Sequence, residues 1–523
     1  MIIVNNIKLS LDTDFSNLIP ILAKHLKTDV GNINSVSLYR KSVDARKKED
    51  VHFCCSFLVD LKSEQDRILR KNKNANPYKE QKYNWKKADI IPENRPIVVG
   101  FGPAGMFAAL LLARAGLKPL VLERGNDVET RARDVEEFFS GGKLKENSNV
   151  QFGEGGAGTF SDGKLNTGIK DGRCKTVLEA LVSFGADKKI LTDAKPHIGT
   201  DILKTVVKNL RQEVISLGGE VRFDTLLEDI NIKNNKVESV TANGEIIPCE
   251  KLILATGHSA RDTFRMLKSK QIEMIRKPFS MGVRIEHLQK DINRSLYGDF
   301  ANHKALGAAD YKLAVHLENG RGVYTFCMCP GGEVINASSS LGHTAVNGMS
   351  NSGRDGVNSN SALLVNVDPE DLAGDDVLAG CAFQEKIEKS AYDIAGGAVP
   401  IETVGSFVFG KEQKLGRINP TVKPETKFCD FSKIFPPFII ESLKEGIVLF
   451  DKKISRFACD DAVLTAPETR SSSPVRIVRG EDGQSVSLAG LFPSGEGAGY
   501  AGGIMSAAVD GLRTAEMLIA SYT

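Results

Sequence analysis

Short, wholly apolar runs alternate with amphipathic segments along much of the chain, most clearly from residue 95 onward. Residues 96–99 (PIVV) and 119–122 (PLVL) predict strands buried on both faces, and residues 106–116 between them predict an alanine- and leucine-rich helix. This order is typical of an α/β domain with a parallel sheet. Residues 490–523 again predict a strand followed by a helix, and we expect them to return to the same domain.

The remaining patterns predict further units. Residues 1–70 alternate as strands with two amphipathic helices and predict a small N-terminal α+β domain. Residues 71–94 are polar and lysine-rich and predict a basic linker or arm. Residues 276–450 are mixed and strand-rich and predict a substrate or cap domain. It would interrupt a discontinuous domain formed by residues 95–275 plus 451–523.

The stretch GFGPAG, Gly100–Gly105, matches the G-x-G-x-x-G spacing of dinucleotide-binding sites in its full context. A buried strand precedes it, a helix follows, and Glu123 ends the next strand, close to the expected spacing of about 20 residues. Gly102 would let the backbone approach a pyrophosphate at the helix N-terminus. Glu123 would accept hydrogen bonds from the adenosine ribose.

Two other stretches repeat the G-x-G-x-x-G spacing without the complete strand–helix–strand context. GEGGAG, residues 153–158, has no good preceding strand and no following helix, so a generic loop and a flavin-contacting loop both stay open. GEGAGYAGG, residues 495–503, has a strand before it and a helix after it, but no second strand follows. We therefore expect one dinucleotide that is held at several points.

Composition and charge restrict the classes of function. With 523 residues, 41% hydrophobic and 26% charged, the chain predicts about three globular domains, and its net charge of +2 favours no polyanionic partner. The N-terminus lacks the pattern of a signal peptide, and Arg114 and Lys118 interrupt the longest apolar stretch. We expect a cytoplasmic protein without a transmembrane segment, whose nine cysteines are reduced.

Several stretches together resemble a known family. The chain resembles the flavoproteins that include p-hydroxybenzoate hydroxylase and geranylgeranyl reductase. More narrowly, it resembles the FAD-dependent dehydrogenase family of bacterial oxidoreductases, from about residue 36 to the C-terminus. The narrow resemblance rests on KSVDARKK, SNVQFGEGGAGTFSDGKL, KPHIGTD, GHSARDTF, GVYTFCMCPGG, SSPVRI and GEGAGYAGGI.

The resemblance implies a Rossmann-like FAD-binding α/β domain with the strand-rich α+β domain inserted. It also implies an FAD-dependent oxidoreductase that transfers hydride through a noncovalent flavin, to or from a small apolar or amphipathic substrate. The expected cofactor-binding residues are Gly100, Gly102, Pro103, Ala104, Gly105, Glu123, Arg124, Gly158, Thr159, Gly257, Gly495, Glu496, Gly502, Gly503 and Ile504. Glu496 departs from the aspartate common at this position in the wider superfamily, which puts its contact with the ribityl chain in doubt.

Two histidines and a cysteine are the candidate catalytic residues. His258 directly follows Ala-Thr-Gly at the end of a predicted strand, and His197 lies in KPHIGTD. Histidine suits proton transfer beside hydride transfer because its pKa lies near neutrality. Cys329 lies two residues after Cys327 in GVYTFCMCPGG, and regular alternation predicts that both face the same side of a strand.

The role of these cysteines stays open among a wall of the flavin pocket, buried structural thiols and a redox pair. Two cysteines one residue apart on a regular strand do not readily form a disulfide. No Cys-x-x-Cys partner is present, so no metal site is expected.

The electron donor and the partners are less defined. If NAD(P)H is the reductant, we expect it to bind transiently, because the chain has no second complete dinucleotide unit. An alternative is an FAD-containing factor that binds nucleic acid or protein through Tyr78, Tyr83 and Trp85 of the basic arm. A solvated linker is favoured there, so a nucleic-acid partner is not expected. A further alternative is a peripheral quinone reductase, although no amphipathic membrane helix is evident.

Overall fold

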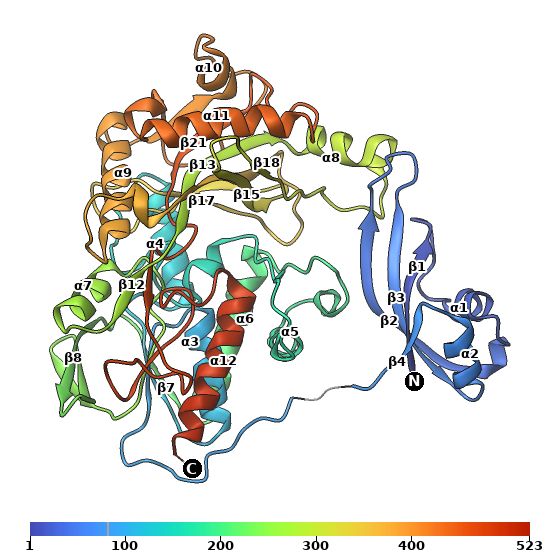
Figure 1. Cartoon of the computed structure of the whole chain (residues 1–523), viewed down its shortest axis with the longest axis horizontal. Helices are drawn as coiled ribbons and strands as arrows, with labels where there is room; N and C mark the ends of the chain where they lie inside the picture. Colours follow the sequence, from blue (N-terminus) through green and yellow to red (C-terminus); the bar gives the residue numbers. More distant parts are fainter. Residues whose placement is uncertain (81–82, 523) are drawn as a thin grey trace.

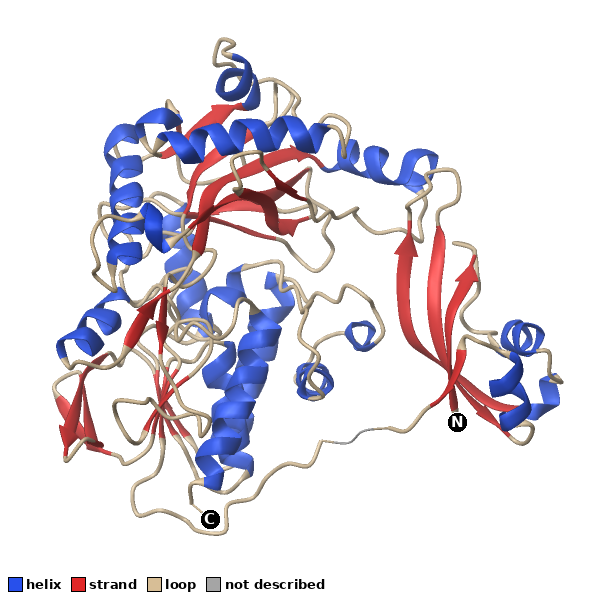
Figure 2. Cartoon of the chain, viewed as in Figure 1, coloured by secondary structure: helices blue, strands red, loops and turns tan. Residues whose placement is uncertain are grey.

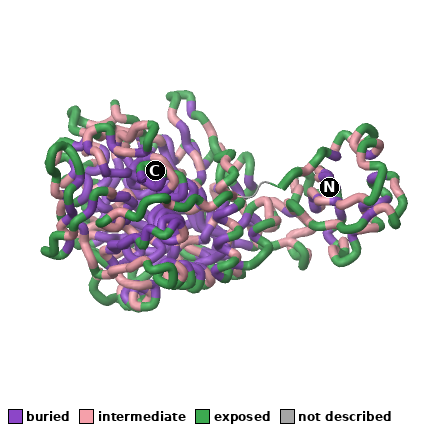
Figure 3. Tube along the Cα trace, turned by 90° about the horizontal axis from the view of Figure 1, so that it is seen from below, coloured by how far each residue is buried: buried purple, intermediate pink, exposed green. Residues whose placement is uncertain are grey.

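The computed structural model describes residues 1–80 and 83–522. Residues 1–77 form a unit that projects from the rest of the molecule, as Figures 1 and 3 show. Its antiparallel sheet has the order β2-β3-β1-β4 and buries Phe53, Phe57 and Val59. The elements are β1 (Ile2–Leu9), α1 (Ile19–Leu26), β2 (Ile33–Asp44), β3 (His52–Leu61), α2 (Gln65–Lys71) and β4 (Ala75–Pro77).

The second unit contains a five-stranded parallel sheet with the order β23-β11-β5-β6-β7. Its strands are β5 (Ile97–Val99), β6 (Leu120–Leu122), β7 (Glu220–Arg222), β11 (Leu252–Leu254) and β23 (Leu491–Pro493). Its helices are α3 (Pro103–Arg114), α4 (Val128–Phe139), α5 (Arg173–Ser183), α6 (Thr200–Ser216), α7 (Arg261–Ser269) and α12 (Ile504–Ala520). This order confirms the predicted Rossmann-like fold, in which β23 returns from the far end of the sequence to pair with β11.

Two small sheets accompany the parallel sheet. One has the order β10-β9-β8, and the other pairs β12 with β22. Their strands are β8 (Leu227–Lys233), β9 (Lys236–Ala242), β10 (Glu245–Pro248), β12 (Met274–Arg276) and β22 (Val475–Ile477).

The third unit, the cap, is a seven-stranded mixed sheet with the order β14-β15-β18-β13-β21-β19-β20. The helix α11 lies along this sheet (Figures 1 and 2), and its Leu443, Ile447 and Phe450 belong to the buried apolar core. The strands are β13 (Phe279–Leu288), β14 (Ala314–His316), β15 (Gly322–Cys329), β18 (Asn358–Val367), β19 (Val399–Thr403), β20 (Thr426–Phe428) and β21 (Val463–Glu468), with the hairpin β16 (Glu333–Asn336) and β17 (Val346–Met349). The helices are α8 (Gln289–Tyr297), α9 (Ala379–Ala395), α10 (Val404–Phe409) and α11 (Pro437–Asp451). Because β21 belongs to this sheet, the cap sheet extends past residue 450.

The predicted arm follows the surface of the second unit. Tyr83 donates a hydrogen bond to Glu516 of α12 at 2.5 Å. The guanidinium of Arg114 lies 4.4 Å from the centre of the Trp85 ring. Residues 81 and 82 of the arm lie outside the described residues. Among the described residues, no helix is both long and apolar enough to cross a bilayer.

Candidate functional site

The turn between β5 and α3 carries the first glycine motif. Gly100 has φ +90°, and a Cβ there would lie 2.4 Å from the carbonyl oxygen of Ala255 at the end of β11. A Cβ at Gly105 would lie 1.9 Å from the carbonyl oxygen of Gly100. Both positions therefore require glycine for the fold itself. Gly102 caps α3 without a side-chain hydrogen bond, Pro103 begins the helix, and the first-turn N–H groups, including that of Ala104, stay available to a ligand.

Glu123 lies just after β6 and is 5% exposed. Its carboxylate accepts hydrogen bonds from the backbone N–H groups of Phe101 at 2.7 Å and of Gly125 and Gly153 at 3.0 Å. A carboxylate offers about four lone-pair sites, so these three bonds leave one for a ribose hydroxyl. Glu123 thus also joins the first glycine turn to the second glycine stretch.

The second glycine stretch lies directly against the first. The N–H of Gly155 donates to the carbonyl of Phe101 at 2.8 Å. A Cβ at Gly102 would lie 3.6 Å from the Cα of Gly156. Thr159 is buried and donates its hydroxyl to the carbonyl of Glu154 at 3.2 Å. The two stretches therefore form one site, which agrees with the expectation of a single dinucleotide.

The C-terminal glycine stretch completes the same edge of the sheet. Gly495 follows β23 and donates its N–H to buried Asp510 of α12 at 2.7 Å. A Cβ at Gly158 would lie 3.1 Å from Cγ1 of Ile504, the first residue of α12. The structure therefore brings all three glycine stretches together. α12 begins after Gly503 without a side-chain cap, so a second helix N-terminus is open at this edge.

His258 forms a pair with Glu496 across this edge. Its Nδ1 lies 3.3 Å from Oε1 of Glu496, and its side chain is 10% exposed. Nε2 is buried and has no hydrogen-bond partner among the described residues. Gly257, directly before it, has φ +71°, and a Cβ there would meet no atom within 4 Å. Arg124, also expected at the cofactor, binds Asp262 at 2.9 Å and lies over the ring of Phe152.

The other two candidate catalytic residues belong to a different cluster. His197 Nε2 lies 3.3 Å from the carbonyl of Ser352, and burial lowers its pKa to about 4, so the ring is neutral. Its backbone bridges to Lys164, whose ammonium donates to the carbonyl of Met328, next to Cys329. His197 and Cys329 are thus linked through Lys164 and do not contact the His258–Glu496 pair.

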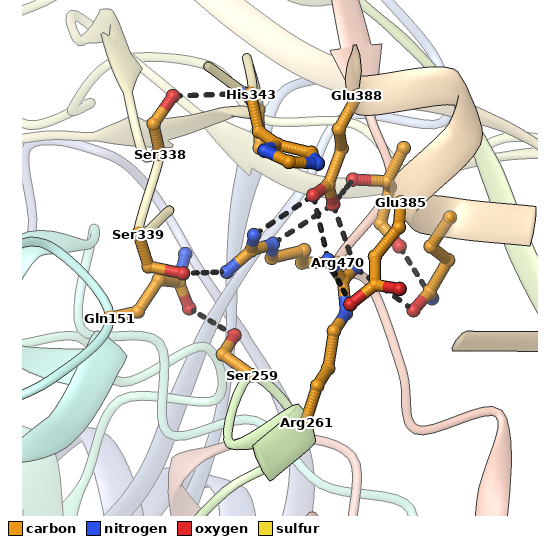
Figure 4. Close-up of polar contacts among 12 residues, drawn as sticks. Gln151, Ser259, Arg261, Ser338, Ser339, His343, Glu385, Glu388 and Arg470 are labelled. Carbon is orange, nitrogen blue, oxygen red and sulfur yellow. Dashed lines mark hydrogen bonds and ion pairs between the residues drawn. The ribbon is translucent and has the colours of Figure 1, made fainter. Parts of the chain in front are cut away.

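A buried ionic cluster joins the second unit to the cap (Figure 4). Arg261 of α7 binds Glu388 of α9 through two hydrogen bonds at 2.8 and 2.9 Å, and Arg470 binds the same carboxylate at 3.0 Å through each of two nitrogens. Thr469 adds a fifth bond at 2.6 Å. Arg470 also contacts Ser339 of the cap. The cluster fixes how the cap sits beside the glycine site, with Arg261 three residues from His258.

Sequence reasoning missed Arg131 and Glu388, two charged residues that support this site. Arg131 of α4 is fully buried and donates to the carbonyls of Asn149, Val150 and Glu154, which hold the second glycine stretch in place. The signal was present, because Arg131 lies at helical spacing between the apolar residues Val128 and Val135. Glu388 shares a face of α9 with Cys381, Ala391 and Ala395, so its burial had a similar signal, but its arginine partners come from distant segments.

The residues present fit an extended dinucleotide. Two uncapped helix N-termini begin at the carboxyl edge of one parallel sheet, beside adjoining glycine backbones. A Cβ at Gly502 or Gly503 would meet no atom within 4 Å, so this backbone lies open to a ligand. The buried, unpartnered Nε2 of His258 supplies a further polar atom without a protein partner.

Comparison with known proteins adds the family. Residues 278–471 match the model of the FAD-dependent protein, C-terminal domain-like family, and residues 1–60 match a domain of unknown function. An uncharacterized protein of Clostridium beijerinckii is 47% identical over 525 residues, which cover 99% of this chain and 98% of the relative. Protein FixC of Salmonella typhi is 26% identical over 182 residues, 34% of this chain and 40% of the relative.

Solved structures are similar at lower identity. A geranylgeranyl bacteriochlorophyll reductase-like protein of Thermoplasma acidophilum is 13% identical, with 82% of this chain and 80% of that chain covered and a TM-score of 0.36. Glycine oxidase of Bacillus cereus is 11% identical, with 82% and 98% covered and a TM-score of 0.33.

The match over residues 278–471 indicates an FAD-dependent protein, which agrees with the dinucleotide site that the glycine stretches form. FAD is the dinucleotide that the family uses. The chain belongs to the same family as the Clostridium beijerinckii protein, a family of FAD-dependent proteins.

Proposed function

We propose that this protein is an oxidoreductase that transfers hydride through FAD, to or from a small apolar or amphipathic substrate admitted between the second unit and the cap. The observation that carries the proposal is the meeting of three glycine stretches and two open helix N-termini at one sheet edge. FAD supplies the two-electron chemistry, and the protein supplies position and polar groups.

The cofactor-binding residues divide by the part of FAD that they would hold. Gly102 and the first-turn N–H groups of α3 would bind the pyrophosphate. Glu123, with one lone-pair site left, would bind the adenosine ribose. The N–H groups at the start of α12 would bind the polar edge of the flavin ring, where electron uptake places negative charge. Among the other expected contacts, Arg124, Gly158, Thr159, Gly257 and Gly495 would line the path between these parts.

The His258–Glu496 pair supports a role in proton transfer. Glu496 contacts Nδ1 of His258, which orients the ring and leaves Nε2 as the atom that would give or take a proton. The contact engages Oε1 of Glu496 and leaves its other carboxylate oxygen for the expected bond to the cofactor. His197 is a weaker candidate, since burial keeps it neutral and its nitrogen lies beside a backbone carbonyl.

The pair is tested by two substitutions. In His258→Asn we expect flavin reduction to slow by about 10²-fold or more, because a positioned general acid or base contributes about 10²–10⁴-fold. Glu496→Gln should cause a smaller loss and shift the pH profile of the rate. The FAD content should not change in His258→Asn. His25→Asn, at an exposed position on α1, is the control. An unaltered rate and pH profile in His258→Asn would exclude the role.

The donor is tested by mixing the FAD-loaded protein anaerobically with NADH or NADPH. We expect one of them to bleach the visible flavin band at a rate that saturates with its concentration. Photochemical reduction of the same sample shows that the flavin can accept electrons. If neither nucleotide bleaches the band while light does, the reductant is not a nicotinamide, and the hydride-transfer proposal then rests on the substrate alone.

The arm bears on the nucleic-acid alternative. Tyr83 and Trp85 contact Glu516 and Arg114 of the second unit, and Tyr78 contacts Tyr39. These rings therefore already make contacts within the chain. This favours a structural arm over a stacking platform for bases.

A further inference from the structure

The strand β15 contains a bulge at its two cysteines. Phe326 pairs with Ala362 of β18, but the next pair joins Cys329 with Asn360, so β15 has one extra residue between these pairs. Cys327 takes up the extra residue with φ +42°, a conformation uncommon for residues other than glycine. The regular alternation predicted from the sequence is therefore wrong at this point, because the extra residue bends the strand.

The bulge changes what the two thiols can do. On a regular strand the two Cα atoms would lie about 6.6 Å apart with parallel side chains, near the upper limit for a disulfide. Here the Cys329 thiol donates to the carbonyl oxygen of Cys327 at 3.2 Å, so its side chain turns back along the strand toward Cys327. The expectation that cysteines at this spacing do not readily form a disulfide assumes a regular strand, and β15 is not regular at this point.

Two cations lie beside the thiols. Arg284 of β13 is fully buried and donates to the Cys327 carbonyl at 2.7 Å, and the same nitrogen lies 3.7 Å from Sγ of Cys329. Glu468 binds its other terminal nitrogen at 3.2 Å. The ammonium of Lys164 donates to the carbonyl of Met328, between the two cysteines. Positive charge of this kind favours the thiolate form of cysteine.

The two cysteines differ in exposure and acidity. Cys327 is partly exposed, whereas Cys329 is buried. The neighbouring Cys329 thiol, followed by the charges of Arg284 and Lys164, lowers the pKa of Cys327, whereas the Cys327 side chain and burial raise the pKa of Cys329. Burial raises the pKa of six other cysteines, Cys55, Cys174, Cys249, Cys381, Cys429 and Cys459. An accessible, acidic thiol next to a second thiol is the pattern of an attacking and a resolving cysteine.

We propose that Cys327 and Cys329 form a reversible dithiol–disulfide pair that exchanges with low-molecular-weight disulfides. The Cys327 thiolate attacks one sulfur of the disulfide, forms a mixed disulfide and releases one thiolate. Cys329 then loses its proton to solvent and attacks Sγ of Cys327, which releases the second thiolate and closes the internal disulfide. The protein pair loses two electrons, and the small disulfide gains them. The proposal goes beyond the FAD chemistry, and neither step requires the flavin.

The test follows the sulfur atoms by mass in the FAD-loaded protein, after reduction and exposure to glutathione disulfide. In the wild type we expect an internal Cys327–Cys329 disulfide and no stable adduct. In Cys329→Ser, glutathione should stay attached to Cys327, because the resolving thiol is absent. In Cys327→Ser, neither product should form at these positions. Cys174→Ser, which changes another partly exposed cysteine, should behave as the wild type.

A second measurement concerns reactivity. At neutral pH we expect iodoacetamide to alkylate Cys327 about tenfold faster than Cys174, because a larger thiolate fraction outweighs the lower nucleophilicity of an acidic thiol. Equal rates, or a wild type that keeps both thiols reduced while Cys329→Ser gains no glutathione at Cys327, would overturn the proposal. A protein that forms the disulfide but fails every test of flavin reduction would refute only the proposed oxidoreductase function.

Discussion

In Gly102→Ala we expect a protein that folds normally but binds FAD about 10- to 100-fold more weakly, so that it purifies with little colour. Gly102 has φ −79°, and its added Cβ would lie 3.6 Å from the nearest atom, the Cα of Gly156, which is an ordinary contact distance. The methyl group would occupy the space that the pyrophosphate needs. Overpacking of this kind costs about 1–3 kcal/mol, which corresponds to a factor of about 5 to 150 in affinity.

The measurement is FAD affinity by fluorescence titration, with circular dichroism as a check on folding. Gly307→Ala is the matched control, because a Cβ there meets no atom within 4 Å and the position is exposed. Gly105→Ala should instead disturb folding, since its Cβ would lie 1.9 Å from the carbonyl oxygen of Gly100. If Gly102→Ala keeps its colour and its affinity, the first glycine turn does not hold the pyrophosphate.

Glu388→Gln should lower the free energy of unfolding by about 3–5 kcal/mol, because removing one partner of a buried ion pair leaves uncompensated charge in the interior. In this case two guanidinium groups, those of Arg261 and Arg470, would lose their shared carboxylate. Since these arginines lie on either side of the junction between the second unit and the cap, unfolding in urea should separate into two transitions. FAD should also be released more readily.

Glu385→Gln is the control on the same helix. Glu385 pairs with Arg265, whose side chain is 58% exposed, and an exposed pair contributes about 0–1 kcal/mol. Glu385 also lies 3.9 Å from Arg261, which is beyond hydrogen-bond distance, so its loss should still cost far less than that of Glu388. The pH dependence gives an independent check. The two arginines hold the pKa of Glu388 below its ordinary value of 4.5, so its stabilising effect is present above pH 4.5 and is lost as the pH falls below it. Glu388→Gln should lack this acid-dependent loss, and a variant as stable as Glu385→Gln would contradict the assignment.

Much of the fold followed from apolar patterning. The strands at 97–99, 120–122 and 252–254 are continuous apolar runs, and such runs are typical of the centre of a parallel sheet. The return of β23 to this sheet was predictable. Residues 490–523 contain a strand, a glycine turn and a helix, but no second strand beside which the first could pair. The bulge at Cys327 was not predictable. It depends on the register in which β15 pairs with β18, and the sequence of one strand does not determine that register.

The candidate site was predicted unevenly. The glycine positions were predictable, because a left-handed backbone conformation or a close approach of two backbone segments selects glycine at a defined place in the sequence. The acidic partners of the buried arginines were not, because Glu468 and Glu388 meet Arg284 and Arg470 from segments far away in sequence. The contact between His258 and Glu496 belongs to the same class, since two loops meet only after β11 and β23 have paired.

The pairing of β11 with β23 has a consequence for synthesis on the ribosome. While the cap emerges, β11 is present without its neighbour, and its backbone groups on that edge have no sheet partner until residues 491–493 follow. The nascent chain therefore carries an unfinished sheet through the translation of the whole cap. The three glycine stretches can therefore meet only after residues 495–503 have been synthesised.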